Sequence, residues 1–263
     1  MSNAVMPLSD YENTCEKIRE KTNITDKIKS GELADKVNEV YEKGKQAEYD
    51  NFWDIFQSNG TRKNYYNAFY GSGWTDEIFK PKYDIKPTNA YAMFNASKIT
   101  DLVTIAEQCG IVMDFSDNTN FTTTFAQSTI KKIGVVDTRS ADLIQQTFYN
   151  AQQIQSIEKV ILNDDGSQTI TNPFNWNYAL EEIRFEGVIG GLMTFGHATK
   201  LSKASIQSIV SHLSDTTSGK TLTLNKTAVN NAFETVSGTA DGSTSEEWLN
   251  LVASKPNWTI SLS

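Results

Sequence analysis

The chain has few of the residues on which metal binding and nucleophilic catalysis depend. Its 263 residues include two cysteines, Cys15 and Cys109, and two histidines, His197 and His212. Without a CxxC pair or a nearby histidine, the cysteines do not predict a zinc site, and we expect no metal and no cofactor. The sequence also has no nucleophile elbow, phosphate-binding loop or HExxH helix. It therefore favours a protein that is not an enzyme.

Pairs of carboxylates are the remaining enzymatic alternative. The adjacent pairs 181–182 and 246–247 are all glutamate. Adjacent residues of a strand point to opposite faces, and the second pair lies where a helix is expected to begin. Residues 163–167 (NDDGS) predict a turn, which is the usual role of Asp-Gly. A calcium site is the alternative, since two carboxylates adjoin a glycine, but the segment lacks the spaced acidic residues and distal glutamate of a calcium loop.

Long apolar runs and blocks of positive charge are absent as well. No run reaches the roughly 18 apolar residues that a membrane-spanning helix needs, and residues 1–10 do not resemble a signal peptide. The net charge of −8 disfavours contact with a phosphate backbone. We expect no nucleic-acid binding, no membrane insertion, and synthesis in the cytoplasm without a conventional export leader.

What the sequence does contain is a loose repeat between residues 89 and 201. In each copy an aromatic residue is followed by a small residue and then by two aliphatic residues, usually three positions apart. Successive copies begin roughly 20–30 residues apart, which is the period of a leucine-rich-repeat solenoid. The leading residues are Phe94, Phe125, Phe148 and Phe174, with a degenerate copy at Phe195 and an earlier one at Phe69.

Each copy predicts one coil of the solenoid. Residues 133–137, 157–162 and 183–189 are predicted strands, and the leading phenylalanine would fill the space between coils. A single coil cannot bury that ring, but stacked coils would bury a continuous column. The alternative is a set of unrelated strands and loops in which phenylalanine happens to recur.

Regions on either side of the repeat predict helices. An apolar stripe runs through Leu33, Val37, Val40 and Tyr41 and resumes at Phe52, Trp53 and Phe56. It could cover one end of the solenoid, assemble with copies of itself, or do both. After residue 200 we expect a helix capped by Ser202, a strand at 221–224, a polar link at 225–242, a helix opened by Ser243 and Glu246, and a strand from Trp258.

The predicted fold class is therefore α/β. It is an irregular leucine-rich-repeat-type solenoid with an N-terminal helical segment and a C-terminal α/β cap. The expected domains are 1–58, an N-terminal helical docking or assembly segment, 59–200, the solenoid, and 201–263, a helix–strand–helix–strand cap.

Several aromatic residues are candidates for contacts with a partner. Residues 64–74 are rich in aromatics, and they could supply core residues such as Phe69 and Trp74 or a patch that faces a sugar or receptor. Tyr149, Trp176 and Tyr178 each follow a leading phenylalanine closely, where the chain is expected to turn out of the core. Buried packing is the alternative for each of these three.

Three parts of the chain resemble a known family. Phage and prophage tail or baseplate-region proteins of Gram-positive hosts resemble this chain in its N-terminal motif, in the segment after that motif and in its tail. The repeats resemble BspA-like leucine-rich repeats. They contain less leucine and are less regular than is usual for that class. The quoted motifs are 15–22 (CEKIREKT), 26–34 (DKIKSGELA), 41–53 (YEKGKQAEYDNFW), 71–77 (GSGWTDE), 201–210 (LSKASIQSIV), 221–224 (TLTL) and 258–260 (WTI).

The resemblance implies a non-enzymatic virion structural protein of a tail, baseplate or fibre-associated assembly. Such a protein would dock by its N-terminus and present its repeat surface to other virion proteins or to a host surface receptor. It would be a homo-oligomer and would join the virion in the host cytoplasm. The alternatives are a bacterial cell-surface leucine-rich-repeat adhesin, which predicts export and an anchoring segment, and a glycan-degrading tail enzyme, which predicts two convergent carboxylates in a groove.

Overall fold

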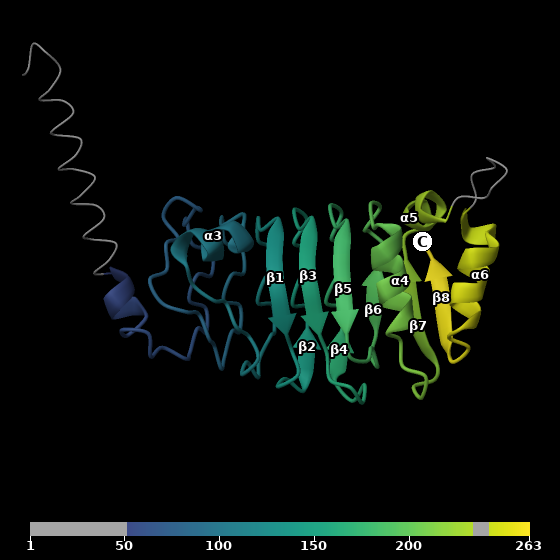
Figure 1. The fold of residues 1–263 in the computed structure, drawn as a ribbon, viewed down its shortest axis with the longest axis horizontal. Coiled ribbons are helices and arrows are strands. Elements are labelled where there is room, and N and C mark those ends of the chain that lie inside the picture. The colour runs from purple at the N-terminus through teal and green to yellow at the C-terminus, as the bar shows by residue number, and fades with distance from the viewer. Residues whose placement is uncertain (1–51, 234–241) are drawn as a thin grey trace, which may run out of the picture. The chain divides into compact units, whose positions relative to one another are not determined.

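The protein is described by a computed structural model that defines residues 52–233 and 242–263. The chain divides into two units between Phe52 and Trp53, and apart from Phe52 the described residues belong to the second unit. That unit is a parallel β-solenoid (Figure 1). The predicted repeat solenoid is thus confirmed at the level of architecture.

All the strand pairs of the described residues are parallel. They form three sheets, ordered β1-β3-β5, β2-β4 and β6-β7-β8. In chain order the elements are α3 (Leu102–Cys109), β1 (Lys132–Asp137), β2 (Leu143–Gln145), β3 (Ser156–Ile161), β4 (Thr169–Thr171), β5 (Glu182–Glu186), β6 (Met193–Phe195), α4 (Lys203–Ser211), β7 (Lys220–Leu224), α5 (Lys226–Ala232), the 3-10 turn η1 (Gly242–Thr244), α6 (Glu246–Ala253) and β8 (Trp258–Leu262).

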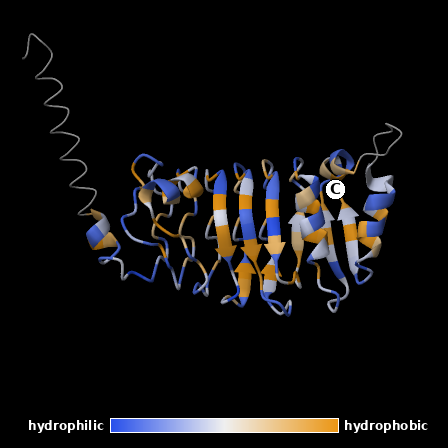
Figure 2. Cartoon of the chain, viewed as in Figure 1, coloured by the Kyte–Doolittle hydropathy of each residue, from blue (hydrophilic) through white to orange (hydrophobic). Residues whose placement is uncertain are grey.

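The central sheet places equivalent aliphatic residues of successive coils side by side. Ile133 of β1 pairs with Ile157 of β3, which pairs with Ile183 of β5, and all three are buried. Apolar and polar residues alternate along β5, as the period of a half-buried strand requires, and Figure 2 shows hydrophobic and hydrophilic segments along the sheet. The three predicted repeat strands are confirmed.

The leading phenylalanines form the predicted continuous column. Phe148 is stacked on Phe125 with a centroid distance of 5.3 Å and on Phe174 with a distance of 4.9 Å. The column continues through Phe94 to Phe69 on one side and to Phe195 on the other. All six rings are buried. Each stacked pair adds about 0.5–1.5 kcal/mol beyond the burial of its area.

Left-handed backbone conformations flank the phenylalanines in a regular way. The second residue before Phe125 is Thr123 (φ 52°), and the second residue after it is Gln127 (φ 55°). The amide groups of Thr123, Phe125 and Gln127 all donate to carbonyls of the next coil, at 2.8–3.1 Å. The two left-handed residues therefore turn alternate N–H groups toward the neighbouring coil. The same two positions are left-handed around Phe69, Phe94, Phe148 and Phe174, at residues 67, 71, 92, 96, 146, 150, 172 and 176.

Buried amide side chains satisfy carbonyl groups at the turns. Gln168 donates from Nε2 to the carbonyls of Thr138 and Ala141, at 2.6 and 2.7 Å. Asn177 donates from Nδ2 to the carbonyls of Phe148 and Ala151, at 2.8 and 2.9 Å. The carbonyls of Thr138, Phe148 and Ala151 also accept backbone amides of their own turns, so the side-chain amides add a second hydrogen bond there and supply the one that Ala141 accepts. A net hydrogen bond of this kind contributes about 0.5–1.5 kcal/mol.

Helices lie beside both edges of the central sheet. Asp101 bridges Lys132 of β1 and caps α3, so the copy that begins at Phe94 continues as a helix where the later copies form strands. On the other edge, α4 accepts hydrogen bonds from the backbone of β5 through the hydroxyls of Ser205 and Ser208, each at 2.9 Å. The edge of β5 is thereby partnered, which limits edge-to-edge pairing with other chains on that side.

The C-terminal predictions are confirmed in part. Ser202 caps α4, and the expected strands are β7 and β8. Two details were wrong. The expected polar link contains α5, because Asn225 accepts hydrogen bonds from the amides of Thr227 and Ala228. The last helix, α6, is capped by Ser245 and not by Ser243.

Candidate functional site

The clearest exposed cluster of aromatic side chains joins two adjacent coils. Trp176 and Tyr178 lie between β4 and β5, and their side chains are 38% and 40% exposed. The indole of Trp176 is stacked on the imidazole of His197, which follows β6, with a centroid distance of 4.1 Å. Tyr178 contacts both rings, at 6.2 and 5.4 Å. We call Trp176, Tyr178 and His197 the aromatic cluster.

The backbone holds the aromatic cluster in place. Trp176 has a left-handed conformation (φ 68°), which is uncommon for a bulky residue and turns its side chain away from the column. Asn177, between the two exposed aromatics, is buried and anchored by its amide. His197 Nδ1 is buried and has no hydrogen-bond partner among the described residues, whereas the face of its ring packs on Trp176. Tyr149, the third predicted contact residue, is half-buried on the neighbouring coil.

A second aromatic surface lies at the other end of the solenoid. Tyr66 is stacked on Tyr91 with a centroid distance of 4.8 Å, and its side chain is 51% exposed. Arg62 and Lys63 lie beside Tyr66 around a shallow depression. Phe69, in contrast, is buried in the column. The aromatic segment at 64–74 therefore supplies both core and surface, and its exposed part is bordered by positive charge.

The predicted assembly residues fall into two groups. Leu33, Val37, Val40 and Tyr41 lie outside the described residues. Phe52 is 36% exposed, whereas Trp53 is buried against Phe69 and Phe79. Phe56 also packs against the core, and the guanidinium of Arg62 lies 4.3 Å from its ring centroid. Trp53 and Phe56 therefore contribute to the core of the solenoid unit.

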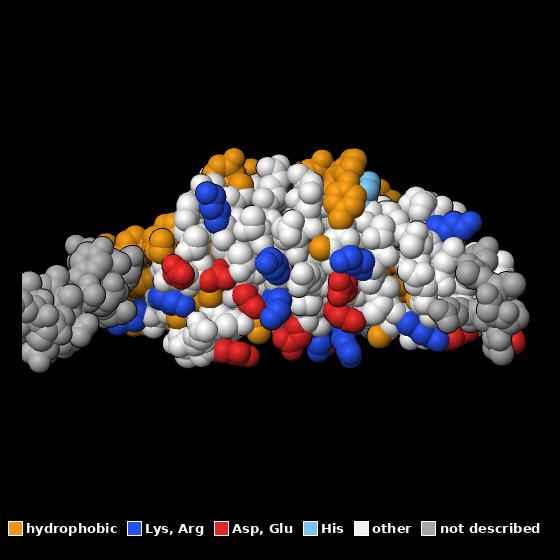
Figure 3. All heavy atoms as spheres, turned by 90° about the horizontal axis from the view of Figure 1, so that it is seen from above, with side chains coloured by type: hydrophobic (Ala, Val, Ile, Leu, Met, Phe, Trp, Pro, Cys, Tyr) orange, Lys and Arg blue, Asp and Glu red, His pale blue; other side chains and the backbone are white. Residues whose placement is uncertain are grey.

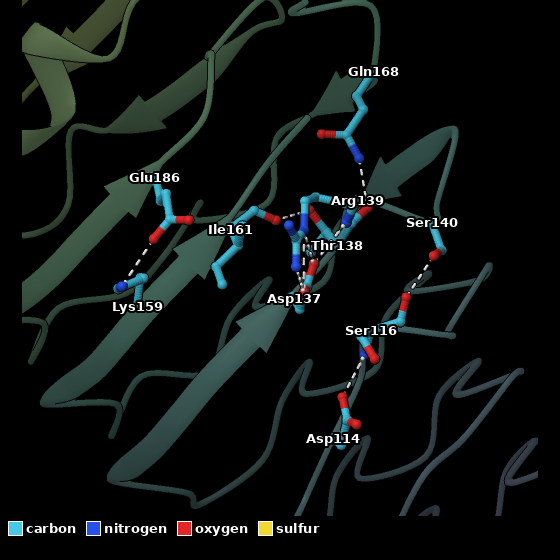
Figure 4. A network of polar contacts seen from close by, with 10 residues as sticks. All are labelled: Asp114, Ser116, Asp137, Thr138, Arg139, Ser140, Lys159, Ile161, Gln168 and Glu186. Atoms are coloured by element: carbon cyan, nitrogen blue, oxygen red, sulfur yellow. Dashed lines mark hydrogen bonds and ion pairs between the residues drawn. The ribbon is translucent and has the colours of Figure 1, made fainter. Parts of the chain in front are cut away.

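A polar network follows the ends of β1, β3 and β5 (Figure 4). Arg139 donates to both carboxylate oxygens of Asp137, with the shortest contact at 2.6 Å, and this hydrogen bond raises the pKa of Arg139. Lys159 donates to Glu186 at 2.8 Å and lowers the pKa of its carboxyl group. The Lys159–Glu186 pair joins β3 to β5, whereas Asp137 and Arg139 belong to one coil.

Three of the four carboxylates that the sequence left as an enzymatic alternative have nearby partners. Glu181 is paired with Lys200 at 3.5 Å, and Glu182 accepts from Ser202 at 3.0 Å. Glu247 is paired with Lys203 at 2.6 Å. These contacts connect β5 with α4, and α4 with α6. The residues that the structure describes include no group of three or more His, Cys, Asp or Glu side chains that could hold a metal.

An apolar groove separates α3 from β1. It has a volume of about 340 Å³, and Val112 and Val135 are exposed beside it. Glu107 and Glu158 are its charged lining residues. Cys109, at the end of α3, forms no disulfide, and burial raises the pKa of its thiol. No helix in the described part of the chain is long and apolar enough to span a membrane.

Comparison with known proteins does not place the chain in a family. No family model, curated protein or solved structure matches it. The class of protein is therefore defined by the fold alone, a parallel β-solenoid with an internal phenylalanine column and an exposed aromatic cluster.

Proposed function

We propose that this chain is a non-enzymatic bacteriophage virion structural protein that presents a binding surface on its solenoid. The observation that carries the binding role is the aromatic cluster. Large aromatic side chains are enriched in contact surfaces, and here two of them are exposed and held by stacking and by a left-handed turn. A surface that is ordered before binding loses less conformational entropy when a partner arrives.

The assignment to a virion rests on the resemblance of residues 15–53 to tail and baseplate-region proteins. The N-terminal segment would dock the chain on the particle, and the solenoid would face a virion partner or the host envelope. A homo-oligomer is expected because virion components are usually repeated by symmetry. A bacterial cell-surface adhesin remains the second candidate, because an exposed aromatic cluster suits it equally well.

Finer features of the fold belong to the same proposal. The phenylalanine positions are spaced by 21 to 31 residues, close to the period of leucine-rich repeats, and we infer a BspA-like type of coil. Residues 201–263 would act as an α/β cap that covers the last coil, as repeat arrays require. The sheet β6-β7-β8 and the helices α4 and α6 supply the elements for this role.

Two measurements test the proposal. Mass spectrometry and immunogold labelling of purified phage particles should locate the chain on the tail or baseplate. Fluorescently labelled protein should bind host cells, and the double variant Trp176→Ala/Tyr178→Ala should bind them more weakly while keeping its circular dichroism spectrum. A chain found only on bacterial surfaces would favour the adhesin. Unchanged binding by the folded variant would remove Trp176 and Tyr178 as contacts.

A further inference from the structure

The surface around the aromatic cluster consists of two rows of residues that repeat from coil to coil. The first row is the second residue after each column phenylalanine, and the second row is the fourth. In the first row, the amide of Gln127 donates to the carbonyl of Tyr149, and the amide of Asn150 donates to that of Asn175, so successive members are held in adjacent coils. The first row is Gly71, Ala96, Gln127, Asn150, Trp176 and His197, and the second is Gly73, Lys98, Thr129, Gln152, Tyr178 and Thr199.

These rows carry little charge. Lys98 is the one Lys, Arg, Asp or Glu among their members, and it lies three coils from Trp176. Near the aromatic cluster the other row members carry amides and hydroxyls, and Gln127, Thr129, Gln152 and Thr199 are all exposed. Lys200, which follows Thr199, is paired with Glu181. Figure 3 shows hydrophobic side chains and a histidine at the upper edge, with uncharged side chains beside them, whereas most charged side chains lie nearer the middle of the view.

From this arrangement we infer that the aromatic cluster and the adjoining amide row bind a neutral oligosaccharide, and this inference rests on the proposed attachment function. Sugar rings present apolar C–H faces that pack on aromatic rings, and hydroxyl groups that both donate and accept hydrogen bonds. Amide side chains offer both roles as well. Gln152 donates to Asn150 at 2.8 Å, which orients the two amides beside Trp176. An anionic glycan would find no cation among the row members nearest to the cluster.

The surface formed by Tyr66 and Tyr91 provides an internal comparison. It has a stacked aromatic pair in which Tyr66 is exposed and Tyr91 is half-buried, but Arg62 and Lys63 border it. It therefore offers stacked rings in a positively charged setting, although Asn64 also lines the depression. A neutral sugar should depend on Trp176 and Tyr178 and should not depend on Tyr66 and Tyr91.

The first experiment is an array of neutral and acidic oligosaccharides probed with the full chain, followed by titration calorimetry with the strongest binder. We expect a neutral sugar to bind, and Trp176→Ala/Tyr178→Ala to weaken it about tenfold or more. Gln127→Ala/Gln152→Ala should also weaken it. Tyr66→Ala/Tyr91→Ala is the matched control and should leave affinity unchanged. A thermal melt of each variant serves as the control that it is folded.

Host cell walls separate this inference from the attachment function. Binding that survives protease treatment of the walls but is lost after periodate oxidation of their sugars supports a glycan ligand. Binding that protease abolishes, with no hit on the array, overturns the glycan inference and leaves attachment intact, with a protein as the partner. A preference for acidic sugars, or dependence on Tyr66 and Tyr91, also overturns it. Absence of binding to both walls and array contradicts the attachment function itself.

Discussion

The phenylalanine column should dominate the stability of the solenoid, and Phe148 is the position at which to test it. Its ring is 1% exposed and is stacked between Phe125 and Phe174 at nearly parallel angles of 4° and 9°. Truncation of a buried phenylalanine to alanine costs about 3–5 kcal/mol. Because Phe148→Ala removes two ring contacts and opens a cavity between coils, we expect a loss in the upper part of that range.

A smaller change separates ring stacking from the loss of volume. Phe148→Leu keeps most of the apolar volume and removes both stacked pairs, so it should cost about 1–3 kcal/mol. Urea denaturation followed by far-ultraviolet circular dichroism gives both values as changes in the free energy of unfolding. The double variant Phe125→Leu/Phe148→Leu, compared with its two single variants, gives the coupling energy between Phe125 and Phe148, which we expect to be about 0.5–1.5 kcal/mol.

The surface ring Tyr66 is the control, since its side chain stacks on Tyr91 but remains half exposed. Tyr66→Ala should cost less than about 1 kcal/mol. If Phe148→Ala were no more destabilising than Tyr66→Ala, the column would not support the fold. If the coupling between Phe125 and Phe148 were zero, the parallel rings would contribute only their buried area.

Three further predictions concern the backbone, a helix cap and assembly. Thr123→Gly should raise the melting temperature slightly, because a β-branched residue at φ 52° is strained. Thr122→Gly is the control and should lower the melting temperature, because glycine adds entropy to the unfolded chain. Equal changes in melting temperature would refute the strain at Thr123. Asp101→Ala should destabilise by about 0.5–2 kcal/mol, and Asp101→Asn by less, because asparagine also caps helices. Burial alone would raise the pKa of Asp101, but the Thr104 amide and Lys132 outweigh it and the pKa is lowered. Its contribution is therefore present above the unfolded pKa of about 3.9 and is lost as pH falls through the folded value. Urea denaturation at pH 3 and pH 7 should show a smaller difference in the free energy of unfolding between Asp101→Ala and the wild type at pH 3. An equal difference at both pH values would contradict a charged cap at Asp101. In light scattering, the full chain should be an oligomer and a chain lacking residues 1–52 should be a monomer. The truncation ends before Trp53 and Phe56 because these residues belong to the solenoid core. If both chains were monomers, assembly by the N-terminal segment would be contradicted.

The phenylalanine column was accessible from sequence because a large aromatic residue recurs where each coil must be filled. The left-handed positions were accessible only in part, since Asn67, Gly71, Asn150 and Asn172 carry the expected residue types. Ala96, Thr123 and Gln127 carry none of the glycine or asparagine signal that usually marks such backbone, and only the hydrogen bonds to the next coil require it. Tertiary pairing imposes this conformation, and local preference does not reveal it.

Two helices show the same limit. Val103, Thr104 and Ile105 favour strands, yet α3 forms because Asp101 caps its first turn and Gly110, at φ 64°, closes its end. In α5, Asn225 supplies the cap, but the helix is too short to show an apolar period. Hydrogen bonds at the capping residues fix where α3 and α5 form, and the period of the apolar residues does not predict either helix.

Part of the candidate site followed from the sequence. Trp176 and Tyr178 were predicted to leave the core, and they are exposed. The partner ring of His197 was not predicted, because it comes from the next coil. A signal for it was present: His197 stands two residues after Phe195, as Trp176 stands two residues after Phe174. Alignment of the repeats by their phenylalanines would have brought these two residues together.

The ladder of hydrogen bonds between coils has a mechanical consequence. The amides of Phe69, Phe94, Phe125 and Phe148 all donate to the next coil, so these bonds run from coil to coil along the stack. Tension applied between the first and last coils would load the junctions in series, and the weakest would yield first. Such a chain would lengthen under load by releasing one coil at a time, and each released coil would dissipate work before the next gave way.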